Sequence, residues 1–72
     1  MYKITWKQNK STKAQKYEGF IQRGTMRICI AIITKKGKSW NVDWTTDKVK
    51  DSVHKSLQVA KDFVYTFFNE SN

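Results

Sequence analysis

Residues 16–45, KYEGFIQRGTMRICIAIITKKGKSWNVDWT, decide the fold of this chain of 72 residues. Three runs rich in β-branched and aromatic residues lie in this stretch, at 16–22, 25–34 and 39–45. Such residues favour strands, and the glycines between the runs accept the positive φ angles that tight turns require. The stretch therefore predicts three antiparallel strands joined by turns at Arg23-Gly24 and Lys35-Lys36-Gly37.

A fourth strand is predicted ahead of this stretch, at residues 2–8. Apolar and polar residues alternate there, with Tyr2, Ile4 and Trp6 on one side and Lys3, Thr5 and Lys7 on the other. A period of two is typical of a half-buried strand. The polar segment that follows, 9–15, is expected to be a loop.

The last third of the chain changes to a helical period. Apolar residues recur there at spacings of three and four, at Val49, Val53, Leu57, Ala60, Val64 and Phe67. We expect a helix over about 47–69, capped by Thr46 or Asp47. A second interpretation starts the helix at Ser56, also a good capping residue, and leaves 48–55 as a loop or a short strand.

These elements predict one small α+β domain over residues 1–72. Three or four antiparallel strands form a meander, and one C-terminal helix packs across one face of the sheet. The ten aromatic residues can supply a compact core although the hydrophobic share is only 39%. Several small nucleic-acid-binding domains share this layout, but a shared layout does not assign a function.

The register of the strands decides which side chains face the helix. A three-residue loop at 35–37 is favoured because it collects apolar residues on one face, by pairing Ile32 with Trp40, Ile30 with Val42 and Ile28 with Trp44. A two-residue turn at 36–37 would instead pair Ile33 with Trp40 and split the apolar residues between both faces. The turn at Arg23-Gly24 is expected to place Ile21 opposite Met26 and Tyr17 opposite Ile30. The residues expected on the other face are Lys3, Lys7, Lys16, Phe20, Arg27, Cys29, Ala31, Ile33, Asn41 and Asp43.

Positive charge is segregated along the chain. Residues 1–40 hold eight Lys and two Arg against one acid, which gives +9, whereas residues 41–72 hold four Lys against five acids, which gives −1. A surface with this asymmetry attracts polyanions. Twelve of the fourteen basic residues are Lys. Lysine acts as a point charge, so contact with a phosphate backbone is favoured over the reading of bases.

The meander brings this charge together. Its first and third loops lie at the same end of the sheet, so Lys10, Lys13, Lys35, Lys36 and Lys38 are expected to converge there. Phe20 is predicted to face outward beside Arg27, as a platform on which bases stack. The predicted nucleic-acid-binding residues are Lys7, Lys10, Lys13, Lys16, Phe20, Arg23, Arg27, Lys35, Lys36 and Lys38.

Catalytic and metal chemistry finds little support in the sequence. His54 is the only histidine and Cys29 the only cysteine, so no zinc site, catalytic triad or internal disulfide is expected. The three tryptophans are expected in the core, and His54 on a solvated helix surface. We expect no enzyme activity and no cofactor. A cytoplasmic protein is expected, because the N-terminus lacks an apolar signal segment and no apolar stretch could span a membrane.

Two functions are consistent with this sequence. The first is a small, non-enzymatic protein that binds DNA or RNA mainly through the charge of the phosphate backbone. The alternative is an inhibitor or adaptor that docks on an acidic surface of a larger host protein. The composition is typical of proteins that AT-rich phage or viral genomes encode. Phe63, Phe67 and Phe68 leave the end of the helix apolar on more than one side, which predicts self-association as a homodimer.

Overall fold

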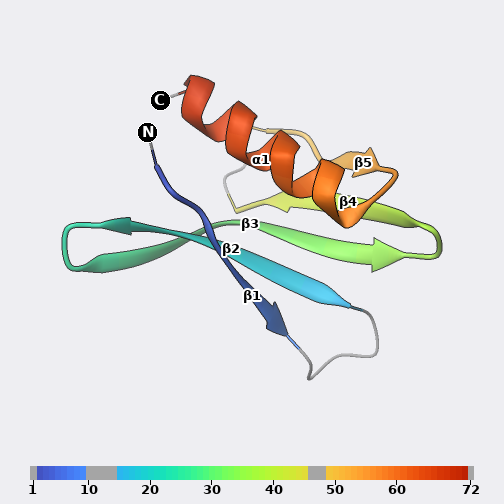
Figure 1. Cartoon of the computed structure of the whole chain (residues 1–72), viewed down its shortest axis with the longest axis horizontal. Helices are drawn as coiled ribbons and strands as arrows, with labels where there is room; N and C mark the ends of the chain where they lie inside the picture. Colours follow the sequence, from blue (N-terminus) through green and yellow to red (C-terminus); the bar gives the residue numbers. More distant parts are fainter. Residues whose placement is uncertain (1, 10–14, 46–48, 72) are drawn as a thin grey trace.

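A computed structural model describes residues 2–9, 15–45 and 49–71 (Figure 1). Its elements are β1 (Thr5–Asn9), β2 (Lys16–Arg23), β3 (Met26–Lys36), β4 (Ser39–Trp44), β5 (Ser52–His54) and α1 (Leu57–Ser71). The strands follow one another across a single antiparallel sheet in the order β1-β2-β3-β4-β5. The predicted α+β meander with a C-terminal helix is confirmed, with five strands in the described chain instead of three or four.

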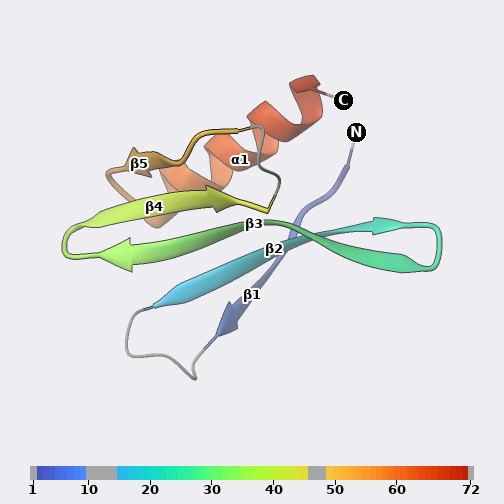
Figure 2. The same ribbon diagram turned by 180° about the vertical axis from the view of Figure 1, so that it is seen from behind.

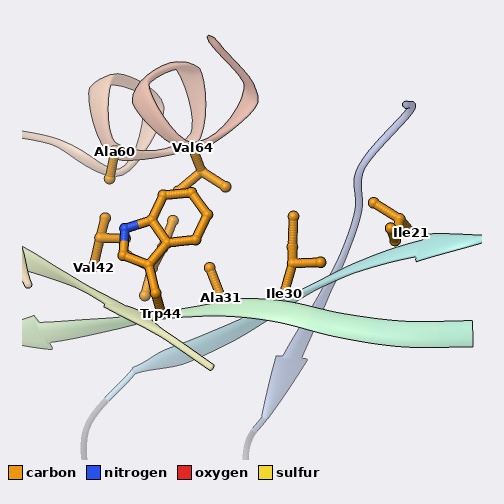
Figure 3. Packing of buried hydrophobic residues seen from close by; sticks show 8 residues of the cluster. Ile21, Ile30, Ala31, Val42, Trp44, Ala60 and Val64 are labelled. Atoms are coloured by element: carbon orange, nitrogen blue, oxygen red, sulfur yellow. The ribbon is translucent and has the colours of Figure 1, made fainter. Parts of the chain in front are cut away.

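The helix covers one face of one half of the sheet. It contacts β3, β4 and β5, and in both views no element of the described chain covers the other face (Figures 1 and 2). The core lies between α1 and these strands, where Ile33, Val42 and Val64 are fully buried. Ala31, Trp44 and Ala60 fill the space around them (Figure 3). Burial of this kind stabilises by about 25 cal/mol per Å² of apolar surface, so the helix and the central strands depend on each other.

The helix begins at Leu57, so the expected start at 47 is wrong and the alternative start after Ser56 is confirmed. The hydroxyl of Ser56 accepts a hydrogen bond from the backbone N–H of Val59 at 3.2 Å, which is an N-cap. The chain just before the helix is extended instead, because Ser52–His54 pairs with β4 as β5. Val53 is 65% exposed and takes no part in the helical face. Thr46 and Asp47, the expected caps, lie outside the described residues.

Both turns of the central hairpins differ from the predicted ones. The turn between β3 and β4 consists of Gly37-Lys38, which pairs Ile33 with Val42 and Lys35 with Trp40. The turn between β2 and β3 consists of Gly24-Thr25. The expected pairs of Ile32 with Trp40, Ile30 with Val42, Ile28 with Trp44, Ile21 with Met26 and Tyr17 with Ile30 are therefore wrong. Gly24 and Gly37 each have φ of 62°, a conformation that two-residue hairpin turns use and that glycine adopts without strain.

A β-bulge at Ile30 decides which residues of β3 form the core. Gly19 pairs with Ala31 and Phe20 pairs with Cys29, so Ile30 is an extra residue on β3. Its carbonyl accepts a hydrogen bond from the backbone N–H of Thr45 at 3.1 Å. The extra residue reverses the alternation beyond it. Ala31 and Ile33, expected on the outer face, are therefore buried under the helix, and Ile32 points the other way.

The two ends of the chain are tied together. The backbone N–H of Tyr2 donates to Oδ1 of Asn69 at 2.6 Å, and Nδ2 of Asn69 donates to the Tyr2 carbonyl at 3.2 Å. The rings of Tyr2 and Phe68 meet edge to face at 5.5 Å. Both views show the two ends of the chain near each other (Figures 1 and 2). The predicted first strand was expected to start at Tyr2, but β1 begins at Thr5, and the residues before it lie beside the end of the helix instead.

Candidate nucleic-acid interface

Lysines gather at the end of the sheet that holds the β3–β4 turn. The backbone N–H of Lys35 donates to the carbonyl of Gln15 at 2.9 Å, so the residue just before β2 lies near this turn. Lys16 pairs with Thr34 in the same region. Lys10 and Lys13, expected at this end, lie outside the described residues.

Lys55 joins the same group, and the sequence alone did not indicate it. His54 pairs with Trp40 near the start of β4, so the residue after His54 lies close to the β3–β4 turn. A helix that starts at 47 would include Lys55, whereas a start at Ser56 leaves it in a loop or short strand, and neither interpretation places it near the turn. We define the basic end as Lys16, Lys35, Lys36, Lys38 and Lys55, of which all but Lys16 are exposed.

Three aromatic rings lie beside the basic end on the helix side of the sheet. Trp6, Tyr17 and Trp40 are half-buried, and the rings of Tyr17 and Trp40 are 6.0 Å apart. Nζ of Lys35 lies 5.6 Å from the centre of the Trp40 ring. Nζ of Lys61 lies 5.3 Å from the ring of Tyr17 and 5.9 Å from that of Trp6. These distances are within the range of cation–π attraction.

This aromatic group corrects part of the core prediction. Trp44 is buried as expected, but Trp6 and Trp40 lie at the margin of the core. Alternation placed them on the correct face of the sheet. Trp6 lies on β1, outside the strands that α1 contacts, and Trp40 lies near the start of β4, beside the β3–β4 turn.

Phe20 and Arg27 are in contact on the face of the sheet opposite the helix. The guanidinium carbon of Arg27 lies 4.3 Å from the centre of the Phe20 ring. The two residues are diagonal neighbours, since Phe20 pairs with Cys29 and Arg27 with Gln22. Phe20 is half-buried and Arg27 is exposed. The structure therefore places these side chains together, while their role in binding bases stays a prediction.

The opposite face also carries negative charge. Glu18 pairs with Lys7 across β1 and β2, and Asp43 follows along β4. A hydrogen bond with Asp43 raises the pKa of Asp51, and the charge of Asp43 adds to this effect, whereas Lys36 lowers it. This face is consequently mixed in charge and less suited to phosphate than the basic end.

Arg23 and Arg27 lie far along the sheet from the basic end. They belong to the β2–β3 hairpin, whose turn is at the opposite end of β3 from the β3–β4 turn. The ten predicted binding residues thus do not form one cluster. The described ones divide into the basic end, the β2–β3 hairpin with Arg23 and the contact between Arg27 and Phe20, and Lys7 on the opposite face.

Cys29 and His54, the only cysteine and histidine of the sequence, are both half-buried in the sheet. Burial raises the pKa of the Cys29 thiol, and the nearby carboxylate of Glu18 raises it further. His54 lies on β5 and not on the helix surface that was expected. Its Nε2 is 2.9 Å from the hydroxyl of Ser52, and its ring is 4.7 Å from that of Phe63. Within the described residues, no three His, Cys, Asp or Glu side chains are grouped to hold a metal ion.

The three phenylalanines predicted for self-association pack within the chain. The ring centre of Trp44 is 6.5 Å from that of Phe63 and 5.3 Å from that of Phe67. Phe68 meets Tyr2, and all three phenylalanines are half-buried. Self-association through these rings stays a prediction. The large apolar side chains that the helix exposes are Val59 and Tyr65.

Comparisons with known proteins give no indication of what this site binds. No protein-family model matches the chain, and neither the curated proteins nor the solved structures include a match. In the described part of the chain, no helix has the length and apolar character that crossing a membrane requires.

Proposed function

We propose that this protein binds nucleic acid without enzymatic activity, mainly by holding the phosphate backbone with lysine side chains. The observation that carries the proposal is the basic end, where five lysines from β2, β3, the β3–β4 turn and the connection between β5 and α1 lie together. Lysine ammonium groups on exposed positions suit phosphate, because they act as mobile point charges. DNA and RNA backbones offer the same chemistry to such groups.

Salt dependence tests this proposal directly. Each phosphate that a lysine neutralises releases a counterion, so affinity falls with salt at a log–log slope of about −0.9 per contact for duplex DNA and about −0.7 for single strands. Four to six contacts give slopes of about −3 to −5. Fluorescence anisotropy with labelled DNA and RNA between about 50 and 200 mM salt measures the slope. Absence of binding at the lowest salt would overturn the proposal.

A pair of double variants locates the contact. Lys36→Gln with Lys38→Gln removes two charges from the basic end, whereas Lys3→Gln with Lys50→Gln removes two charges elsewhere, and all four side chains are exposed. The first pair should reduce the slope by about 2, and should weaken binding to all sequences alike. The second pair should change the slope little. Equal effects of the two pairs would show that overall charge, and not the basic end, carries the binding.

A second function has one observation in its favour. No element of the described chain covers the sheet face opposite the helix (Figure 2), and on β5 the apolar side chain of Val53 is 65% exposed. Apolar surface rimmed by charge is typical of a protein-binding site, so an inhibitor or adaptor that docks on an acidic protein surface is the alternative. Capture from a lysate with and without nuclease separates the two. A protein partner that remains after nuclease treatment supports the alternative, and loss of all partners supports nucleic-acid binding.

A further inference from the structure

The β2–β3 hairpin extends beyond the rest of the sheet as a two-stranded arm. β1 pairs with β2 only as far as Phe20, and β4 pairs with β3 only as far as Ala31. Residues 21–28, which we call the arm, therefore pair only with each other. Both views show the arm projecting away from the helix (Figures 1 and 2).

The root of the arm is fixed in the core. Ile21 is 4% exposed and pairs with Ile28, which packs against the same core cluster. The bulge at Ile30 lies just beyond this pair, and bulges bend a strand and increase its twist. The bulge thus sets the direction in which the arm leaves the sheet. The arm is a built projection and not an extension of the flat sheet.

The arm carries the only two arginines of the chain and an exposed apolar side chain. Arg23 pairs with Met26 at the tip, and the guanidinium of Arg27 lies over the ring of Phe20 at the root. Gln22, Arg23, Thr25, Met26 and Arg27 are all exposed, and Met26 is exposed by 64%. No acidic residue lies between positions 19 and 30. Most of the surface of Met26 is therefore open to solvent. The arm is therefore cationic, with the planar guanidinium groups of Arg23 and Arg27, and its exposed apolar side chain is that of Met26.

We propose that the arm enters the minor groove of duplex DNA, with Arg23 and Arg27 along the groove and Met26 against a base step. This inference rests on the proposed function and deepens it. Some DNA-binding proteins place a two-stranded β-ribbon in the major or minor groove to contact the bases. Minor-groove binders combine Arg and Gln with apolar wedges, among them Met. The narrow minor groove of A·T tracts has an enhanced negative potential that attracts arginine.

Duplex DNA is the ligand that this shape fits. A-form RNA has a wide, shallow minor groove, and a single strand has no groove for a ribbon to enter. The arginines lie at the opposite end of the sheet from the basic end, so their contribution can be measured apart from that of the lysines. A lysine contact with phosphate carries no base information, whereas an arm in the minor groove distinguishes A·T from G·C pairs.

Inosine substitution tests which groove is used. Inosine·cytosine pairs present the same major-groove edge as G·C pairs but lack the N2 amino group in the minor groove. The 72-residue chain should bind an inosine·cytosine duplex about tenfold more tightly than the matching G·C duplex. The A·T duplex should behave like the inosine duplex, and both should bind better than RNA duplexes or single strands. Equal affinity for the inosine and G·C duplexes would overturn insertion into the minor groove.

Substitutions in the arm test the residues. Arg23→Lys with Arg27→Lys keeps the charge, and should abolish the preference for inosine while it preserves the salt slope. Met26→Ala should remove the rise in 2-aminopurine fluorescence that an unstacked base step produces. Val53→Ala is the matched control, because Val53 is 65% exposed on the body of the sheet and should change neither measurement. Circular dichroism and thermal melts verify that these exposed substitutions leave the fold intact.

The outcomes separate this inference from the proposed function. If arm variants and Val53→Ala behave alike while binding keeps its steep salt dependence, the arm proposal is wrong and the backbone-binding function stands. If no nucleic acid binds at low salt, both are wrong. A selective loss in the arm variants supports both.

Discussion

The indole of Trp6 lies directly against the backbone of Gly19, its partner across β1 and β2. A Cβ atom at position 19 would come within 2.8 Å of two atoms of the indole ring, closer than packed carbon atoms approach. Glycine is therefore required here for close approach and not for its φ angle. The contact fixes the indole at the edge of the helix-side face, where Nζ of Lys61 lies 5.9 Å from its centre.

Replacement of Gly19 by Ala should destabilise the fold through this contact. The added methyl group forces the indole of Trp6 to move, and overpacking of this kind costs about 1–3 kcal/mol in the free energy of unfolding. Urea denaturation measures the change. In a Trp6→Ala background the same methyl group meets no ring, so Gly19→Ala should there be neutral or stabilising. The interpretation fails if the cost of Gly19→Ala is the same in both backgrounds.

Two neighbouring isoleucines on β3 should respond very differently to truncation. Ile33 is fully buried under the helix, so Ile33→Ala should destabilise by about 2–5 kcal/mol through lost burial and a residual cavity. Ile32 is half-buried on the open face, and Ile32→Ala should cost about 1 kcal/mol. Thermal and urea melts of both variants decide the matter. A larger loss of stability in Ile32→Ala would place the core on the other face of the sheet and would contradict the bulge at Ile30.

The sequence determined the elements of this fold better than their register. Alternation through Trp40, Val42 and Trp44 placed β4 within one residue of its observed end, and the predicted β3 covers most of the observed strand. The predicted alternation of side chains between the two faces of β3 was correct as far as Ile30 and reversed after it. The bulge is held by a hydrogen bond from Thr45, a residue far along the chain, so no local pattern indicates it.

The site could be predicted only where topology alone decides it. Meander order was sufficient to bring Lys35, Lys36 and Lys38 to the returning connection at Gln15, and the phase of β2 was sufficient to place Phe20 outward. The arm could not be foreseen, because its existence depends on where β1 and β4 stop pairing. Lys55 was missed because a strand of three residues, β5, carries too few positions to outweigh a helical period.

The start of the helix should depend on the hydroxyl of Ser56. Its oxygen accepts the N–H of Val59, one of the donors that the first turn of a helix leaves without a partner inside the helix. Ser56→Ala should lower the free energy of unfolding by about 1 kcal/mol, and Ser56→Asp, which keeps an acceptor, should retain most of it. Urea titrations compare the two variants. An equal loss in Ser56→Ala and Ser56→Asp would contradict the capping role.

The carboxyl pair of Asp43 and Asp51 predicts a pH-dependent stability. The hydrogen bond with Asp43 and the charge of Asp43 raise the pKa of Asp51 in the folded chain. The folded state then binds this proton more tightly than the unfolded state. The resulting stabilisation is fully present below the ordinary Asp pKa of about 3.9 and is lost as pH rises through the raised value. At neutral pH the two carboxylates repel each other.

Asp51→Asn should therefore stabilise the protein at neutral pH and much less in acid. The amide resembles the protonated carboxyl, since it can donate to Asp43 without carrying charge. Thermal melts at low salt between about pH 3 and 7 should show that the difference in Tm between Asp51→Asn and the unmodified chain widens as pH rises. Asp43→Asn removes the same repulsion from the other side and should give the same trend. A difference in Tm that stays constant across this range would show that the two carboxyls do not share a proton in the folded chain.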